Sequence, residues 1–345
     1  MNSQEKYELL TRNLKEVVGD DRVKSILDER DLKIYFGTAT TGVPHVGYFV
    51  PILKIGDFLK AGAEVTILFA DLHAYLDNMK STWELLEHRV AFYELLIKEM
   101  LSSVGVPLEK LKFVRGTDFQ LSREYTLDVY KLSATSSLRN AQHAGAEVVK
   151  QTDNPKISGL LYPGLQALDE EYLGVDVQFG GVDQRKIFMY AREFLPKIGY
   201  KKRSHFMSHL IPGLGESGKM SSSEPNSKID FFDTDKQIRK KISKAFCQDG
   251  VVEGNGLLAL LKYVLFVKYE HEGEDFVIER PEQYGGNISF SSYDEVENSF
   301  ASKELSSIDL KQGISNEIIK FVTPIREKLL ENSELGKKAY PEIFK

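Results

Sequence analysis

The sequence predicts an α/β protein in which a doubly wound parallel sheet is followed by a mainly α-helical part. Residues 64–70 are β-branched and almost continuously apolar, which is typical of a strand buried on both faces. Strand-like and helical segments alternate over about 200 residues, as expected for an open parallel sheet covered by helices. Beyond residue 233 the expected segments are mostly helical.

The first elements follow from hydrophobic periodicity. Residues 3–18 carry apolar side chains at helical spacing, so one amphipathic helix is predicted there. A strand is predicted at 31–36 and a helix at 48–59. Further strands are expected at 111–115, 174–179 and 204–210, and further helices at 82–104, 122–138 (with Ser122 as N-cap), 159–173 and 183–195.

The second part begins after a glycine-rich loop at 213–223. We expect a first domain at residues 1–228 and a helical domain at 229–345, with an inserted subunit-contact segment around 122–154. Helices are predicted at 235–246, 256–266, 293–301 and 308–330, with a short extended pair at 276–278 and 288–290.

Composition excludes several classes of protein. The 345 residues carry a net charge of -6, so any site for a polyanion must come from local clusters of basic residues. The single cysteine, Cys247, excludes an internal disulfide and a multi-cysteine metal site. No apolar run is long enough to cross a membrane, and the acidic N-terminus lacks a signal sequence. The expected location is the cytosol.

Residues 35–48 (YFGTATTGVPHVGY) are predicted as a strand end, a turn of small residues and a helix start. Backbone N–H groups and the positive end of a helix dipole favour a phosphate at such a turn. Neither standard glycine-rich phosphate motif is present, but His45 offers an imidazole two residues before Gly47. An ordinary β–α turn is the alternative interpretation.

Two short motifs give this turn a context. HVGY at 45–48 opens the first crossover helix, and KMSSS at 219–223 lies about 170 residues later in the glycine-rich loop. Together they resemble the signature motifs of class I aminoacyl-tRNA synthetases, a family with a Rossmann-like catalytic domain. ADLHAY at 70–75, LYPGLQALD at 161–169 and GVDQRK at 181–186 resemble the tyrosyl enzymes of the archaeal and eukaryotic cytosolic branch. This resemblance covers about residues 7–330.

The resemblance implies a ligase that joins tyrosine to ATP as tyrosyl-adenylate, releases pyrophosphate and then transfers tyrosine to the 3′-terminal adenosine of tRNA(Tyr). It implies ATP as substrate, Mg²⁺ as cofactor, a homodimer and an anticodon-binding role for the helical domain. No metal-ligating residue is among the candidates. Tyr48 and Ser222 stand where the general motifs have a second histidine and a second lysine, which leaves one imidazole and one ammonium at the phosphates.

The implied site residues fall into three groups. The catalytic group is His45, Gly47, Lys219, Met220, Ser221, Ser222 and Ser223. In the tyrosine pocket, Tyr35 and Asp169 would hold the phenol, Tyr162, Gln166 and Gln184 the ammonium, and Gly37, Ala70, His73 and Gln120 the walls. Contacts to tRNA would come from Arg185, Lys186, Met189, Tyr284 and Asp309, although Ser306 and Ser307 replace a His-Pro pair that is frequent in the family.

One check does not depend on the resemblance. Tyr162, Gln166 and Asp169 are spaced i, i+4 and i+7, so a single helix face presents all three. Without the resemblance, however, Tyr35 and His73 would be read as core residues, 169–171 as a solvated helix face and 221–223 as a linker.

Three rival functions remain open from the sequence. A tryptophanyl-tRNA synthetase would share the fold, but the pair Tyr35 and Asp169 argues against an indole substrate. A catalytically idle RNA-binding relative would not need His45, Lys219 and the pocket residues. A nucleotidyltransferase with the His-x-Gly motif would not need the helical domain.

Overall fold

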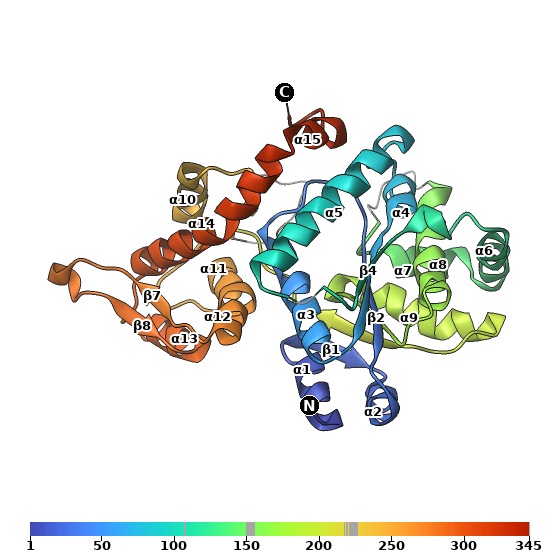
Figure 1. The fold of residues 1–345 in the computed structure, drawn as a ribbon, viewed down its shortest axis with the longest axis horizontal. Helices are drawn as coiled ribbons and strands as arrows, with labels where there is room; N and C mark the ends of the chain where they lie inside the picture. The colour runs from blue at the N-terminus through green and yellow to red at the C-terminus, as the bar shows by residue number, and fades with distance from the viewer. Residues whose placement is uncertain (107, 150–155, 217, 219, 221–226, 345) are drawn as a thin grey trace.

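The computed structural model describes residues 1–106, 108–149, 156–216, 218, 220 and 227–344. Figure 1 shows two lobes, one built on a central sheet and one mainly helical. The sheet has the order β1-β6-β5-β2-β3-β4 and is parallel except for β1. Its strands are β1 (Leu14–Val18), β2 (Lys33–Thr38), β3 (Glu64–Phe69), β4 (Leu111–Arg115), β5 (Val177–Gly181) and β6 (Ser204–Ser208). The predicted doubly wound sheet is confirmed.

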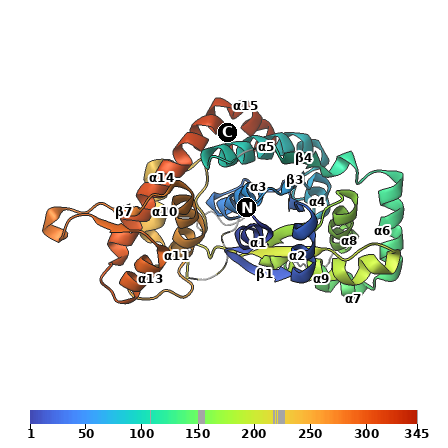
Figure 2. The same ribbon diagram turned by 60° about the horizontal axis from the view of Figure 1, so that its bottom comes forward.

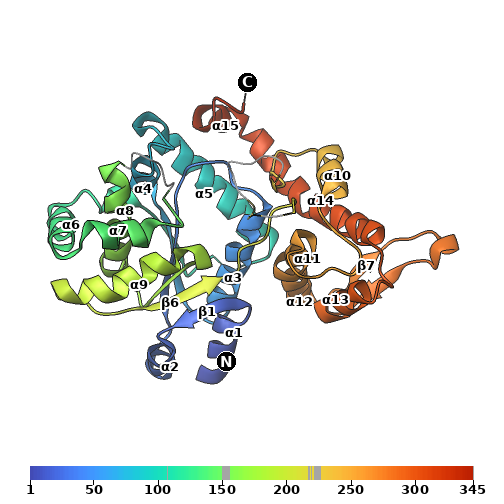
Figure 3. The same ribbon diagram turned by 180° about the vertical axis from the view of Figure 1, so that it is seen from behind.

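The prediction of one helix over residues 3–18 is wrong. The helix α1 (Ser3–Thr11) ends before Asn13, whose φ of 57° lies in the left-handed region that often terminates helices. Leu14–Val18 then forms the edge strand β1, antiparallel to β6 (Figure 3). The apolar spacing fits a helix, but the β-branched pair Val17 and Val18 satisfies its backbone groups against β6 instead.

Helices cover both faces of the sheet. In Figure 1, α3 and α5 lie on the side that faces the helical lobe, and α6 to α9 lie on the opposite side. The helices of this lobe are α2 (Asp20–Glu29), α3 (Phe49–Lys60), α4 (Asp71–Leu76), α5 (Leu86–Ser103), α6 (Arg123–Thr135), α7 (Leu138–Gly145), α8 (Ile157–Tyr172) and α9 (Arg185–Phe194). Ser122 is the N-cap of α6, as predicted.

The order of the strands places a ligand-binding crevice. The chain runs outward from β2 through β3 to β4, then returns to the other side of β2 with β5 and β6. In doubly wound sheets, ligands bind outside the carboxyl ends of the strands at the point where the order reverses. Here that point lies between β2 and β5, where Tyr35 is paired with Gln178.

The helical lobe contains the expected elements. They are α10 (Asp235–Lys244), α11 (Gly256–Leu260), a π-helical stretch η7 (Leu261–Leu265), α12 (Phe266–Glu272), α13 (Tyr293–Ala301), α14 (Ser307–Glu331) and the pair β7 (Phe276–Ile278) and β8 (Ile288–Phe290). Phe49 of α3 stacks on Phe321 of α14 with ring centroids 4.2 Å apart, which joins the two lobes.

The end of the chain returns to the first lobe. Figure 2 shows α14 running toward α5, with α15 (Ser333–Ala339) packed beside it. None of the described helices has the length and apolar character that a membrane span requires.

Candidate active site

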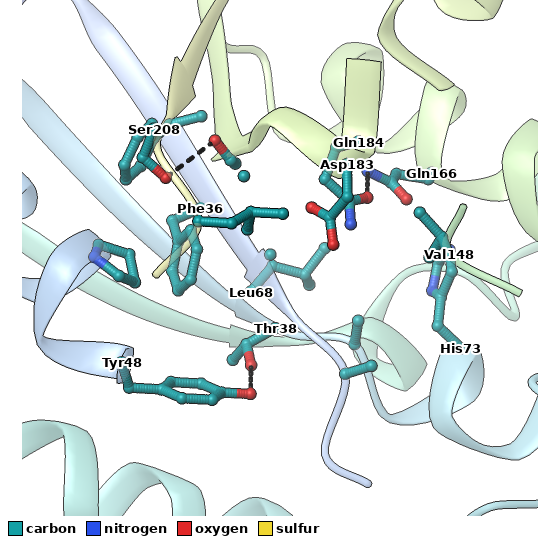
Figure 4. Close-up of a pocket in the computed structure, with 18 of the residues that line it drawn as sticks. Phe36, Thr38, Tyr48, Leu68, His73, Val148, Gln166, Asp183, Gln184 and Ser208 are labelled. Atoms are coloured by element: carbon teal, nitrogen blue, oxygen red, sulfur yellow. Dashed lines mark hydrogen bonds between the residues drawn. The ribbon is translucent and has the colours of Figure 1, made fainter. Parts of the chain in front are cut away.

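A cavity of about 360 Å³ lies at the predicted crevice, at the carboxyl ends of β2 and β5 (Figure 4). This volume suits a small polar substrate, since ligand pockets typically begin at roughly 300 Å³. Eleven of the candidate residues line it: Tyr35, Gly37, His45, Gly47, Ala70, His73, Tyr162, Gln166, Asp169, Gln184 and Met220. The fold therefore brings together residues that are up to 185 positions apart in the sequence (220 − 35).

Asp169 lies at the buried end of the cavity. Its side chain is 1% exposed, and its Oδ1 accepts hydrogen bonds from Gln120 Nε2 and Tyr125 Oη, both at 2.8 Å. Burial raises the pKa of Asp169 to about 8, against the hydrogen bonds from Gln120 and Tyr125. The alternative of a solvated helix face at 169–171 is wrong for Asp169 and for Glu170, which is also 1% exposed.

Tyr35 reaches the same end of the cavity from β2. It is fully buried, and its hydroxyl donates to the carbonyl of Gln166 at 3.3 Å. Burial raises the pKa of Tyr35 well above its ordinary value, and the nearby carboxylate of Asp169 adds to the effect. The two side chains form a polar end to a cavity whose neighbouring residues, Leu68 and Ala70, are apolar.

One face of α8 supplies three of the lining residues. Tyr162, Gln166 and Asp169 all face the cavity, as their spacing predicts. Gln166 Nε2 donates to Gln184 Oε1 at 3.1 Å, so the two glutamines meet across the gap between α8 and the turn after β5. Figure 4 shows them beside Asp183, on the opposite side of the cavity from Thr38 and Tyr48.

His73 is buried against the ring of Tyr162, with centroids 4.6 Å apart in an edge-to-face arrangement. Burial lowers the pKa of His73 to about 4, so its imidazole is neutral near pH 7. Neither ring nitrogen has a hydrogen-bond partner among the described residues. Because buried polar atoms are normally paired, this histidine is suited to a ligand rather than to the core alone.

His45 lies at the other end of the cavity, where the turn enters the short helix η1 (Val46–Tyr48). Its Nδ1 accepts a hydrogen bond from the Gly47 N–H at 3.2 Å, so Nε2 carries the ring proton. Burial, with a smaller effect from the charge of Lys228, lowers the pKa of His45 to about 3. His45 is therefore a neutral hydrogen-bond donor and not a cation.

The turn at His45 is fixed to the segment that follows the glycine-rich loop. His45 forms a β-bridge with Asp230, and the Val46 N–H donates to the Ile229 carbonyl at 3.0 Å. Lys219, Ser221, Ser222 and Ser223 lie outside the described residues. Met220 does line the cavity, and its N–H donates to the Ile211 carbonyl at 3.0 Å.

Replacing Gly47 by alanine is expected to displace the imidazole of His45. A Cβ at Gly47 would lie 2.8 Å from His45 Cε1 and 2.9 Å from Nδ1, and such contacts force a shift. The expected cost to protein stability is about 1–3 kcal/mol. Thermal unfolding and an NMR spectrum of the histidine rings check this, and an unchanged His45 environment would contradict it.

Several pocket residues were missed by sequence reasoning. Asp77 and Lys80 reach the cavity from the loop after α4, and Asp183 comes from the turn after β5. Gln178 lines it from inside β5, and its Oε1 has no partner among the described residues. For Asp77, Lys80 and Asp183 the available signal is position, since they follow β3 and β5 at the same edge of the sheet; Gln178 lies inside β5 and gives no such signal.

The comparisons with known proteins show the family of this chain. The family described as "tRNA synthetases class I (W and Y)" matches residues 27–323. This chain belongs to that family. The resemblance predicted from the two signature motifs is confirmed, and the rival nucleotidyltransferase interpretation is wrong.

Individual relatives are similar over nearly the whole chain. The zebrafish (Danio rerio) protein named "Tyrosine--tRNA ligase, cytoplasmic" is 59% identical over 100% of this chain, which spans 65% of that relative's length. The protein of the same name from Saccharomyces cerevisiae is 51% identical, with 98% of this chain and 88% of the relative covered. The chain thus spans slightly less than two thirds of the zebrafish relative that it matches.

Solved structures give the same result. The tyrosyl-tRNA synthetase of Archaeoglobus fulgidus complexed with L-tyrosine has a TM-score of 0.87 at 34% identity, covering 95% of this chain and 100% of that one. The corresponding L-tyrosine complex from Pyrococcus horikoshii has a TM-score of 0.90 at 25% identity, covering 99% and 100%.

The residues that the family would use for the acceptor end of tRNA do not line the cavity of this chain. Arg185 begins α9 and pairs with Glu16 at 2.8 Å, and Lys186 pairs with Glu147 at 2.9 Å. Met189 is half-buried on the same helix. Contact with RNA at Arg185 and Lys186 would replace these half-exposed ion pairs, which are individually weak.

The two anticodon candidates lie in the helical lobe. Tyr284 is 67% exposed, between β7 and β8. Asp309 lies in the first turn of α14, where Oδ2 accepts from Ser306 Oγ at 3.0 Å and lies 3.5 Å from Arg280 Nη1. Ser306, which replaces a histidine frequent in the family, is therefore the N-cap of α14 and orients Asp309.

Proposed function

We propose that this synthetase is a tyrosine–tRNA ligase. The tyrosine carboxylate attacks the α-phosphorus of ATP and pyrophosphate leaves; a ribose hydroxyl of the 3′-terminal adenosine of tRNA(Tyr) then takes the tyrosyl group and AMP leaves. The observation that carries the proposal is the buried pair of Tyr35 and Asp169 at the end of the cavity. The relatives named tyrosine–tRNA ligase and the L-tyrosine complexes support it.

The pair favours a phenol over an indole. A phenol hydroxyl donates one hydrogen bond and accepts another, whereas an indole N–H only donates. Asp169 is an acceptor when ionised, and the hydroxyl of Tyr35 becomes a donor to the phenol when it gives up its 3.3 Å bond to the Gln166 carbonyl. With tryptophan or phenylalanine these buried groups would lose partners, which is costly. Tyrosine is thus the substrate, and the rival tryptophan enzyme is disfavoured.

The amino acid's ammonium group fits the part of the pocket between α8 and the turn after β5. The hydroxyl of Tyr162 and the amide oxygens of Gln166 and Gln184 are acceptors on adjacent elements. Asp77 and Asp183 add negative charge near Tyr162, whose pKa their charges help to raise. Holding both ends of tyrosine fixes its carboxylate toward the turn at His45, and such positioning supplies a large part of catalysis.

The phosphates of ATP are then stabilised without covalent help from the protein. His45 donates from Nε2 as a neutral group, and the N–H groups at the start of η1 add partial positive charge. Gly47 permits close approach of the phosphate to the backbone. Lys219, which lies outside the described residues, would supply the ammonium for the phosphates.

Mg²⁺ fits this site as a companion of ATP. No group of three or more metal-ligating side chains is found in the described part of the chain, so these residues do not form a metal site from protein ligands alone. Mg²⁺ usually binds one or two carboxylates together with substrate phosphates; Asp183 and Asp77, which is paired with Lys80, line the cavity and would supply such oxygens. When bound, the ion neutralises charge on the phosphates.

Residues 1–228 would carry this chemistry and 229–345 the anticodon contacts, with Tyr284 as a stacking platform for an unpaired base.

A homodimer is part of the proposal. The expected contact segment is residues 122–154, of which 150–154 lie outside the described residues. Within or next to it in the sequence are five apolar side chains that are each at least 51% exposed: Leu121, Leu127, Tyr130, Leu138 and Ile157. The location would be the cytosol, as the names of the relatives state for them.

Charging of tRNA tests the whole reaction. Purified chain, ATP, Mg²⁺ and labelled tyrosine are incubated with unfractionated eukaryotic tRNA, and acid-stable label on tRNA is measured. We expect tyrosine-dependent labelling that a tRNA(Tyr) transcript saturates. No labelling with any tRNA fraction, although the chain is folded, would favour the idle RNA-binding relative.

The affinity for tyrosine is expected to rise with pH up to about pH 8. In the empty pocket Asp169 has a pKa of about 8, raised by burial, so it is mostly protonated near pH 7. A bound phenol that donates to the carboxylate stabilises the ionised form and lowers this pKa. At pH values between the lowered pKa and about 8, binding of tyrosine therefore releases a proton. In this pH range the affinity for tyrosine rises by up to about tenfold per pH unit.

Calorimetric titrations at about pH 6, 7 and 8 in buffers of different ionisation enthalpy measure this proton release. Asp169→Asn is the control, since it has no carboxyl to titrate and should bind weakly with no release from this site. Proton uptake on binding, or release that persists in Asp169→Asn, would contradict the assignment.

A further inference from the structure

Arg89 connects the end of the chain to the wall of the active site. It lies on α5 and is a buried residue, only 5% exposed. Nη1 donates to the carbonyls of Thr41 and Lys80, both at 2.8 Å, and Nε donates to the carbonyl of Ala339 at 3.1 Å. Nη2 reaches Glu342 Oε1 at 3.4 Å. One side chain thus joins three segments that are far apart in the sequence.

The carbonyl next to Thr41 is held in the same way. Gly42 O accepts from Tyr93 Oη at 2.5 Å and from Tyr340 Oη at 3.3 Å. Tyr340 is 1% exposed, and its ring lies 4.8 Å from the guanidinium carbon of Arg89. Residues 39–45, between β2 and η1, are called the signature turn here. Two of its consecutive carbonyls are therefore fixed by α5 and by the C-terminal segment, defined as residues 339–342.

Both segments that Arg89 holds belong to the cavity wall. Thr41 and Lys80 line the cavity, and Thr41 lies four residues before His45. Lys80 follows Asn78 and Met79, whose φ values of 54° and 56° are unfavourable for residues other than glycine. Such backbone persists only when its surroundings hold it, and the bond from Arg89 to the Lys80 carbonyl supplies part of that hold.

We propose that Arg89 and Tyr340, with the C-terminal segment, position the signature turn for the adenylation step; this rests on the proposed function. Neither side chain lines the cavity, so both are positioning residues rather than catalytic ones. Tyr35 and Asp169, which would hold the phenol, are fixed by β2, α6 and α8 instead. Loss of the hydrogen bonds from Arg89 and Tyr340 should then lower the rate of adenylation without weakening tyrosine binding.

Arg89→Lys is the first test. Lysine keeps the charge but lacks the planar set of donors that reaches three carbonyls at once. In tyrosine-dependent ATP–pyrophosphate exchange, kcat is expected to fall at least about tenfold, because small displacements of a reacting geometry cost large factors in rate. The tyrosine dissociation constant should stay within about twofold of wild type, because Arg89 does not line the cavity in which tyrosine would bind.

Arg203→Lys is the matched control. Arg203 is also buried, and it donates to the carbonyls of Val175 and Lys201 and to Glu171, away from the signature turn. It should lower the melting temperature to a similar degree while kcat stays within about twofold. Equal losses of kcat in the two variants, or none in Arg89→Lys, would overturn the proposal.

Tyr340→Phe keeps the test valid if Arg89→Lys does not fold. It removes only the hydroxyl that donates to Gly42 O and retains the ring beside Arg89 and Phe92. We expect kcat to fall roughly two- to tenfold with tyrosine binding unchanged. Loss of tyrosine binding in place of kcat would overturn the positioning role.

The activity of the wild-type chain distinguishes a failure of the proposed function from a failure of the positioning role alone. If it shows no tyrosine-dependent exchange, the proposed function fails and this inference with it. If it is active and Tyr340→Phe has wild-type kcat, the inference alone fails.

Discussion

Replacing His45 by alanine is expected to lower the rate of tyrosyl-adenylate formation by about 10²–10³-fold. The imidazole is 7% exposed and carries its proton on Nε2, because Nδ1 accepts from the Gly47 N–H. A preorganised donor of this kind acts where negative charge develops on the phosphate, and alanine removes it. Because the pocket for the phenol lies at the other end of the cavity, the tyrosine dissociation constant should remain within about twofold.

Single-turnover adenylate formation and equilibrium tyrosine binding, measured on the same His45→Ala preparation, check this prediction. In the empty cavity burial lowers the pKa of His45 to about 3, so the imidazole is a neutral donor when ATP binds. A wild-type adenylation rate in His45→Ala would remove His45 from the mechanism. A loss confined to tyrosine binding would show that His45 acts on tyrosine and not on the phosphates of ATP.

Asp169→Asn is expected to lower kcat/KM for tyrosine by roughly 10- to 150-fold, which corresponds to about 1.5–3 kcal/mol for a hydrogen bond to a charged group. The side chain keeps its size, so the contacts with Gln120 and Tyr125 can persist through the remaining oxygen. Phenylalanine, which lacks the hydroxyl, loses nothing by this change. Its kcat/KM should stay the same or rise, so discrimination between the two amino acids narrows.

Steady-state exchange with both amino acids measures that ratio. Glu170→Gln is the matched control, because Glu170 is an equally buried carboxylate on the same helix that contacts His205 and does not line the cavity. It should affect stability and leave the tyrosine-to-phenylalanine ratio near the wild-type value. An unchanged ratio in Asp169→Asn would show that another group reads the phenol.

Much of the site follows from local sequence. The strand, turn and helix around His45, and the single face of α8 that carries Tyr162, Gln166 and Asp169, depend on spacing within one or two elements. Such patterns are visible in one dimension because periodicity and turn residues act locally. The resemblance then assigned roles to those positions.

Other parts depend on contacts between distant segments and were not predicted. Tyr125 of α6 donates to Asp169 across 44 positions, and Arg89 reaches Ala339 across 250. Charge pattern alone favoured a solvated face at 169–171, whereas Glu170 is buried against His205. At β1, local helical spacing was overridden by pairing with a strand far along the chain. In each case the deciding partner is remote in sequence.

The most direct measurement is ATP–pyrophosphate exchange by the wild-type chain with each of the twenty amino acids at saturating ATP. Tyrosine should support exchange, while phenylalanine and tryptophan should give no rate above the background at concentrations where tyrosine saturates. Exchange with tryptophan but not tyrosine, or none with any amino acid, would contradict the assignment of the pocket to tyrosine.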